Sequence, residues 1–265
     1  MENTSIEKKS IWEETCQIRF GAIDRSDRLT LASVFNFFQE AAISHAENLG
    51  VGRDSMSQTG QAWVLSRMSV LIDRRPMYGE TLTVRTWPRG PEKLFALRDY
   101  DIRDAQDIPA VRARSCWLVV DMEKRRPLRP QAALETLPLN EGVDALPSGA
   151  IGLSERPNLL KKTERVAVYS DLDYNGHVNN VSYIQWIQDA LDAQFLENAS
   201  KMQLDINYLN EVLPCQIVEI WSAPFADDGG LPDAIGPNAF AFEGRKTKAE
   251  NGQIAFRAEL RLMPD

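Results

Sequence analysis

Histidine and cysteine are scarce in this chain of 265 residues, which has two histidines and three cysteines. Cys16, Cys116 and Cys215 are far apart and form no CxxC pair, so the sequence predicts neither a disulfide framework nor a metal site. An odd number of widely spaced cysteines is typical of a reducing compartment. We therefore expect a cytoplasmic protein that uses no metal and no cofactor.

Several common sequence motifs are also absent. The chain has no P-loop, no GxGxxG after a predicted strand and no GxSxG motif, which argues against phosphoryl transfer, nicotinamide chemistry and serine hydrolysis. No run approaches the ~18 apolar residues of a membrane span, and the polar segment Met1–Ser10 has no apolar leader. The net charge of −8 is unlike that of nucleic-acid-binding proteins, which are usually basic. We expect no membrane span and no nucleic-acid partner.

One short segment, DLDYNGHVNN, concentrates polar chemistry. It places Asp173, Asn175 and His177 at alternate positions. In an extended loop alternate side chains point the same way, so we expect the three to converge. A carboxylate, an amide and an imidazole facing one point can move a proton and stabilise a developing negative charge. The alternative is a structural loop in which these side chains form only local Asx hydrogen bonds.

The chain repeats itself at an offset of 149 residues. Asp24 aligns with Asp173, and the alignment continues without a gap into the following segment. Both copies run from a polar loop into an amphipathic helix with apolar residues three or four positions apart. Ser26 and Arg28 fall at the positions of the amide and the imidazole. We therefore expect a single active site, in the second copy.

Strand-like segments follow each of the two helices. They are rich in β-branched and aromatic residues and are bounded by proline and glycine. With an entry strand before each helix, each half is expected to wrap an antiparallel sheet around one long helix, an α+β fold. Thr30 and either Asn179 or Asn180 suit the helix N-caps, and the apolar spacing extends the second helix to Phe195. The expected strands are 63–72, 81–87, 94–102 and 111–121, then 203–209, 216–221, 239–246 and 254–262.

Proline and glycine gather between the two halves, from Pro127 to Pro157. Such a composition is typical of a connection that crosses the surface. We expect an N-terminal domain at residues 10–127, a linker at 128–160 and a C-terminal domain at 161–265, related by a pseudo-twofold axis. Because the two halves already pair, either a monomer or a homodimer is compatible with this arrangement.

The segment DLDYNGHVNNVSYIQW, from Asp171 to Trp186, resembles the signature of the fatty acyl-acyl-carrier-protein thioesterases. Phe37–Ala42 and Val64–Met68 in the first half are also similar to that family's pattern. The resemblance implies two tandem hot-dog domains and, since no transit peptide is apparent, a bacterial member. It also implies hydrolysis of fatty acyl-acyl carrier protein, which releases a free fatty acid and terminates chain elongation.

The resemblance implies four catalytic residues: Asp173, Asn175, His177 and Glu211, which follows the histidine by 34 positions. Val212 stands where plant members often have a cysteine, so we expect direct attack by water. Either carboxylate is a candidate base. The amide either orients the water or donates to the oxyanion, and the imidazole either donates to the carbonyl or holds a carboxylate. The N–H groups of residues 178–180 are further candidate donors.

The first half is expected to shape the acyl pocket. Candidate wall residues, which also suit an ordinary core, are Val34, Phe35, Phe38, Trp63, Leu65 and Met68. Acyl carrier protein is strongly acidic, so docking needs a local positive surface. The densest basic cluster comprises Lys124, Arg125, Arg126 and Arg129. His45 lies on the apolar helix face and is expected to be a packed residue rather than a catalyst.

Three other functions are compatible with these residues. An acyl-CoA thioesterase performs the same chemistry on a different carrier. A hot-dog hydratase also uses Asp and His, although the second carboxylate and the amide favour hydrolysis. A non-catalytic acyl-binding or regulatory module would keep the polar loop for structure alone. The acyl chain length stays open.

Overall fold

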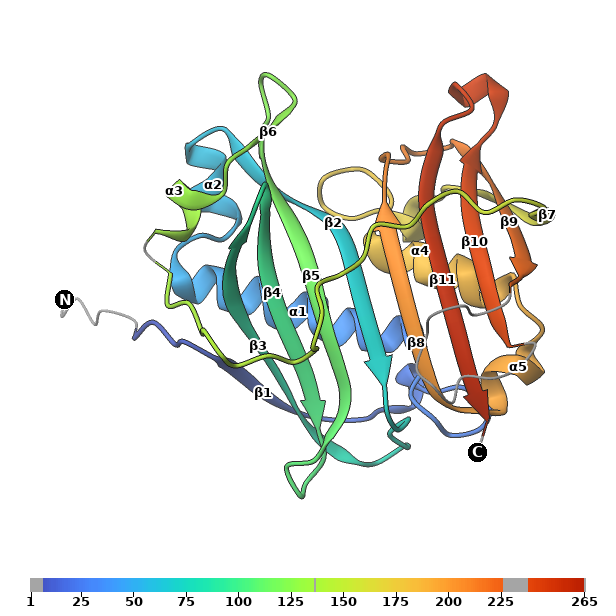
Figure 1. Cartoon of the computed structure of the whole chain (residues 1–265), viewed down its shortest axis with the longest axis horizontal. Coiled ribbons are helices and arrows are strands. Elements are labelled where there is room, and N and C mark those ends of the chain that lie inside the picture. The colour runs from blue at the N-terminus through green and yellow to red at the C-terminus, as the bar shows by residue number, and fades with distance from the viewer. Residues whose placement is uncertain (1–6, 136, 226–237, 265) are drawn as a thin grey trace.

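The computed structural model describes residues 7–135, 137–225 and 238–264 (Figure 1). An antiparallel sheet of eleven strands dominates it. The strands are β1 (Trp12–Gln17), β2 (Gln61–Ile72), β3 (Thr81–Glu92), β4 (Phe95–Arg103), β5 (Pro109–Asp121), β6 (Arg126–Leu128), β7 (Leu160–Val166), β8 (Ala199–Tyr208), β9 (Ile217–Pro224), β10 (Ala239–Lys246) and β11 (Ile254–Pro264). All eight strands expected after the helices are confirmed, with ends shifted by a few residues.

The sheet is built from two halves with the same strand order. The first half reads β1-β3-β4-β5-β2 and the second, in reverse along the sheet, β7-β9-β10-β11-β8, while β6 pairs with β5. The two halves meet at the antiparallel pair β2–β8, from Arg67 opposite Asn207 to Ile72 opposite Met202. The sequence repeat is therefore a structural repeat, and its two copies share one continuous sheet.

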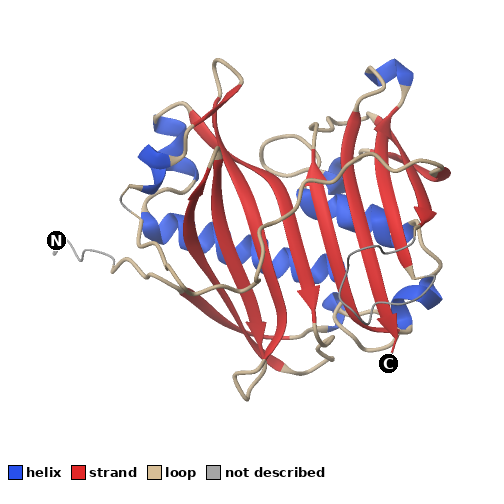
Figure 2. Cartoon of the chain, viewed as in Figure 1, coloured by secondary structure: helices blue, strands red, loops and turns tan. Residues whose placement is uncertain are grey.

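Two helices, α1 (Leu31–Leu49) and α4 (Asn180–Asp189), lie on the same face of the sheet (Figure 2). The side chain of Thr30 accepts a hydrogen bond from the Ser33 amide, and that of Asn179 accepts one from the Val181 amide. These contacts confirm Thr30 as an N-cap and select Asn179 as the second one. Among the described residues no helix is long and apolar enough to cross a membrane.

The second helix is shorter than the apolar spacing predicts. It ends at Asp189, and Asp192 caps a separate short helix, α5 (Ala193–Glu197), by accepting from the Gln194 amide. Aspartate is a strong N-cap, so a new helix begins after Asp192. Leu191 and Phe195 still pack against the core, which explains why their spacing suggested a continuous helix. The other short helices are α2 (Arg53–Gln58) and α3 (Gln131–Leu134).

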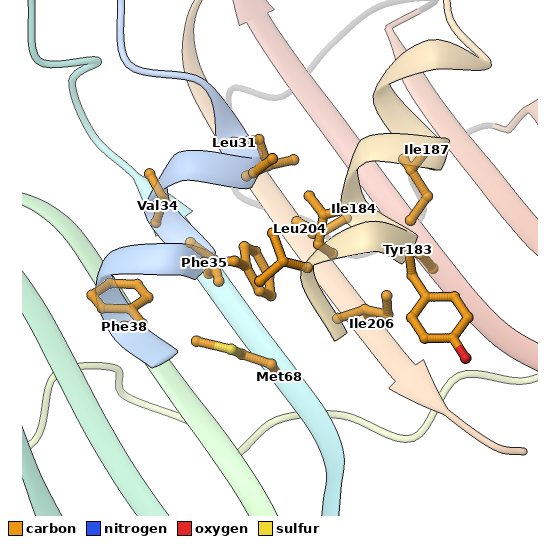
Figure 3. Close-up of a cluster of buried hydrophobic side chains, with 14 of the residues drawn as sticks. Leu31, Val34, Phe35, Phe38, Met68, Tyr183, Ile184, Ile187, Leu204 and Ile206 are labelled. Carbon is orange, nitrogen blue, oxygen red and sulfur yellow. The ribbon is translucent and has the colours of Figure 1, made fainter. Parts of the chain in front are cut away.

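The core lies between the two helices and the sheet and continues across the junction of the halves. Figure 3 shows side chains from α1, α4, β2 and β8 that point toward one another. Removing such side chains from water is the main favourable term in folding, so the two halves stabilise each other. The labelled residues are Leu31, Val34, Phe35, Phe38, Met68, Tyr183, Ile184, Ile187, Leu204 and Ile206.

The connection between the halves crosses the sheet on the face opposite the helices (Figure 1). A buried ion pair holds its first part. The fully buried carboxylate of Asp99 accepts from Nε and Nη2 of Arg114 at 2.6 and 2.7 Å, and from the Ala145 amide of the connection at 2.8 Å. Arg114 also donates to Asp144 at 2.7 Å. Strands of the first half thus fix the connection in place.

The second part of the connection is held by the second half. Asn207 accepts from the Leu153 amide at 2.7 Å and donates to the Ile151 carbonyl at 2.9 Å. Arg156 then pairs with Glu259 on β11 at 2.8 Å. The connection is therefore bound along its length. The predicted end of the N-terminal domain, residue 127, lies within β6. The domain boundaries drawn from composition stay a prediction.

Replacing Arg114 removes the bidentate partner of a buried carboxylate. We expect Arg114→Leu to lose about 3–5 kcal/mol of the free energy of unfolding, the usual result of removing one member of a buried ion pair. Arg112 pairs with Asp73 where both side chains are partly exposed, so Arg112→Leu should lose at most about 1 kcal/mol. Urea unfolding followed by circular dichroism measures both losses, and equal losses would contradict this role of Asp99.

Candidate active site

The polar segment before α4 folds into a tight turn rather than an extended loop. The Asp173 amide donates to the His177 carbonyl at 2.9 Å, and the Gly176 amide donates to the Asp173 carbonyl at 3.1 Å. Leu172 and Val178 form a bridge below the turn. Gly176 has φ +80, a conformation that glycine adopts without strain. The expectation of an extended loop was therefore wrong.

The turn nevertheless brings the three polar side chains together. Oδ1 of Asp173 accepts from the Asn175 amide N–H at 2.8 Å, and Oδ2 accepts from the Asn175 side-chain Nδ2 at 3.3 Å. Nδ1 of His177 lies 3.6 Å from the same Oδ2. Asp173 is thus the centre of the group. The Asx hydrogen bonds weighed as a structural alternative are present, and they are what gathers the side chains.

Glu211 follows β8 and is tied to the turn through its neighbour. The Val178 amide donates to the Val212 carbonyl at 2.8 Å. Tyr183 on α4 is buried beneath this junction, and burial together with the nearby carboxylates of Asp173 and Glu211 raises the pKa of its phenol. Both carboxylates therefore lie near one hydroxyl. Within the described residues no direct hydrogen bond joins Glu211 to the other three side chains.

The first half contains the same turn. The Asp24 amide donates to the Arg28 carbonyl at 2.9 Å, and the Asp27 amide donates to the Asp24 carbonyl at 3.1 Å. Oδ1 of Asp24 accepts from the Ser26 amide at 2.9 Å. Each bond has its counterpart in the second half. The backbone of the turn is therefore duplicated, and the two copies differ in their side chains.

The largest difference concerns the residue that matches Glu211. The Leu29 amide donates to the Pro76 carbonyl at 2.8 Å, as Val178 does to Val212, so Arg75 occupies the position of Glu211. The buried guanidinium of Arg75 pairs with Asp24. Although burial acts in the opposite direction, the hydrogen bond and charge of Arg75 hold the pKa of Asp24 below its usual value. The polar turn of the first half is thus closed by the ion pair of Asp24 with Arg75.

The candidate pocket residues lie mostly within the shared core. Val34, Phe35, Phe38 and Met68 are buried there (Figure 3), and Leu65 is buried on β2. Trp63 is half-buried and donates to the Val51 carbonyl at 2.9 Å. Two pockets on the described surface lie beside Glu259 and beside Phe195, and none of the six residues lines either of them. The acyl wall stays a prediction.

The basic cluster lies at the turn between β5 and β6, next to the site. Asp121 accepts from the Glu123 and Lys124 amides at 3.1 and 2.9 Å and shapes this turn. Nη2 of Arg125 donates to Oε1 of Glu211 at 2.8 Å. Arg126 and Arg129 are exposed. A residue expected to dock a partner therefore contacts a residue expected to catalyse.

Sequence reasoning missed three residues of this region. The Arg53 guanidinium of α2 lies 4.3 Å from the ring centroid of Tyr174, in the turn, and Tyr183 and Arg75 are described above. Nothing in the sequence distinguished Tyr183 from the other residues of the apolar helix face, because that pattern predicts burial only. Arg75 was detectable, since it follows a predicted strand just as Glu211 does.

Both halves of the chain match domains of one known protein family. The N-terminal domain of the acyl-ACP thioesterases matches residues 9–133 and their C-terminal domain matches residues 157–262. The chain belongs to the acyl-ACP thioesterase family. The resemblance carried by the second-half signature is therefore confirmed.

Curated relatives of this family member include two plant enzymes. The palmitoyl-acyl carrier protein thioesterase of Cuphea hookeriana is 27% identical over 233 residues, which cover 83% of this chain and 56% of the relative. The oleoyl-acyl carrier protein thioesterase of Coriandrum sativum is 25% identical over 272 residues, covering 95% of this chain and 72% of the relative. The chain spans about half the length of the first of these relatives.

Solved structures of acyl-ACP thioesterases share the fold. One from Bacteroides thetaiotaomicron has a TM-score of 0.79 at 22% identity and covers 96% of this chain and 98% of its own. The 12:0-ACP thioesterase from Umbellularia californica has a TM-score of 0.79 at 21% identity and covers 97% of this chain and 98% of its own. The predicted α+β fold with tandem hot-dog domains is confirmed.

The other histidine of this family member lies inside the first half, as expected. His45 is fully buried, with Nε2 2.8 Å from the Lys9 carbonyl and Nδ1 3.1 Å from Nη1 of Arg98. Because arginine only donates, Nδ1 accepts and Nε2–H donates. Burial, assisted by the charge of Arg98, lowers the pKa of His45 to about 4. The imidazole is therefore neutral in the folded protein.

This lowered pKa predicts a pH-dependent stability. Between the ordinary value of 6.5 and the folded value of about 4, the unfolded chain binds a proton that the folded protein does not. Stability should therefore fall as the pH is lowered through this range, by up to about 3 kcal/mol. His45→Asn should lack that contribution. Urea unfolding of both proteins at several pH values tests this, and parallel curves would contradict it.

Proposed function

We propose that this chain hydrolyses the thioester of a fatty acyl group on the phosphopantetheine arm of acyl carrier protein, releasing a free fatty acid and ending chain elongation. The observation that supports this most is the turn that gathers Asp173, Asn175 and His177 and is tied to the segment of Glu211. The family and its palmitoyl- and oleoyl-acyl carrier protein thioesterases provide the substrate class.

Glu211 is the base in this proposal. Both oxygens of Asp173 already accept hydrogen bonds from Asn175, so Asp173 serves to orient its neighbours. Glu211 is bound only by an exposed arginine among the contacts described. It takes the proton as the water oxygen adds to the thioester carbonyl carbon. When the intermediate collapses, the carbon–sulfur bond breaks and the proton passes to the departing thiolate.

The amide and the imidazole complete the reaction geometry. Since Nδ2 of Asn175 donates to Asp173, its amide oxygen remains to accept from the attacking water. Asp173 lies beside Nδ1 of His177, which leaves Nε2 to donate to the carbonyl oxygen. The Val178 and Asn179 amides, considered above as donors, instead bind the carbonyls of Val212 and Asp171 at 2.8 Å each. These two N–H groups are therefore engaged and do not serve the oxyanion.

A carrier protein is preferred over coenzyme A for one reason. The basic turn that contains Lys124 and Arg125 reaches the site itself, so an acidic protein docked there would place its arm beside Glu211. Thiol release from acyl carrier protein thioesters of medium to long chain length, with matched acyl-CoAs alongside, tests this choice. Faster release from CoA would assign the chain to the CoA thioesterases, and retention of bound thioester without release would favour a binding module.

The duplicated turn offers a matched pair of variants. Asn175→Ala removes the amide that orients the water, so we expect kcat for acyl carrier protein substrate to fall about 10²-fold or more. Ser26→Ala changes the equivalent position of the first turn and should leave kcat unchanged. Steady-state thiol release measures both, with circular dichroism to check folding. Similar activity in the two variants would return the second turn to a purely structural role.

Docking can be separated from chemistry at the basic turn. Reversing Lys124, Arg126 and Arg129 together to glutamate should raise KM for acyl carrier protein substrate about tenfold or more, because like charges oppose the encounter. A small thioester such as acyl-N-acetylcysteamine does not use this surface, so its KM and kcat should not change. The two substrates are compared by thiol release at low salt. An unchanged KM for the carrier substrate would exclude this patch.

A further inference from the structure

The contact between Arg125 and Glu211 links two functions that are usually separate. The two residues come from different halves of the chain, and their ion pair spans 2.8 Å between Nη2 and Oε1. The Arg125 side chain is 77% exposed and that of Glu211 is 45% exposed. An incoming protein can therefore reach the arginine without any rearrangement of the fold.

The arginine is presented by a structured turn. Asp121 accepts from two successive backbone amides of the turn and lies 3.7 Å from Nζ of Lys124. β6 pairs with the end of β5, with Arg126 opposite Asp121. Arg125 itself has φ +48, which non-glycine residues seldom adopt. The backbone thus holds Arg125 in a defined position beside the site.

Exposed ion pairs are weak and are readily exchanged for another partner. An acidic protein that docks on the turn offers carboxylates in place of that of Glu211. Arg125 holds Glu211 by one hydrogen bond, from Nη2 to Oε1, so a turn of its exposed side chain toward a carboxylate of the carrier breaks that contact. We propose that docking of the carrier protein transfers Arg125 from Glu211 to a carboxylate of the carrier and so frees Glu211 to act as the base.

This inference rests on the proposed function and adds a property to it. Arg125 is a positioning residue: it touches neither the water nor the thioester, and it acts through Glu211. In the free enzyme the base is engaged by the arginine, and a thioester that arrives without the carrier protein is hydrolysed slowly. Selectivity for the carrier thus lies partly in the rate of the chemical step and not only in affinity.

The test uses a small thioester together with a carrier that has no arm. The full chain is given acyl-N-acetylcysteamine, and apo acyl carrier protein, which lacks phosphopantetheine and so leaves the site open, is added in increasing amounts. We expect the wild-type rate to rise about threefold to tenfold. Arg125→Gln should show a similarly raised rate from the start and no further response to the apo carrier protein.

Two variants control the result. Arg125→Lys keeps a cation that can pair with Glu211 and should retain the response. Arg19→Gln removes an exposed arginine elsewhere and should behave as wild type. A wild-type rate that apo carrier protein does not raise, or an Arg125→Gln rate below wild type, would overturn the exchange while the proposed function stands. A wild-type chain that hydrolyses no thioester at all would overturn the proposed function itself.

Discussion

The antiparallel pairing of β2 with β8 determines how the rest of the molecule is arranged. It joins two copies of one motif about a pseudo-twofold axis and merges their cores. Because of that symmetry, parts of the first half border the turn of the second half. Arg53 on α2 reaches Tyr174, and Arg125 reaches Glu211. A single domain of this kind would not supply these contacts to its own turn.

The two turns show how a duplicated backbone came to serve different purposes. In both, an aspartate accepts hydrogen bonds from the backbone two positions further on. In the first copy Arg75 neutralises that aspartate, and a closed ion pair results. In the second copy a glutamate stands at the same place, and the charges of both carboxylates help to raise the pKa of the Tyr183 phenol. Three exchanges, at the positions of Asn175, His177 and Glu211, separate the structural turn from the candidate for acid–base chemistry.

Much of this arrangement was predictable from sequence, because local signals agreed with the global fold. The repeat, the helix caps at Thr30 and Asn179 and the eight strands all have local causes. The shape of the polar turn was misjudged, although Asn175-Gly176 is a turn signal. The match of Arg75 to Glu211 does not follow from the offset of 149, because α1 and α2 together are longer than α4 and α5; only their shared place after a predicted strand indicated it. The contact of Arg125 with Glu211 joins distant segments and had no local signal.

The position of β2 has a consequence for synthesis of the chain. In the finished molecule β2 lies between β5 and β8, yet β8 is made only after the whole connection between the halves. Until then β2 is an open edge strand whose backbone groups lack the β8 partner, and Arg67 is the only charged residue along it. Open apolar edges favour pairing with other chains. Pairing with β8 therefore removes the edge along which the first half would otherwise be open to other chains.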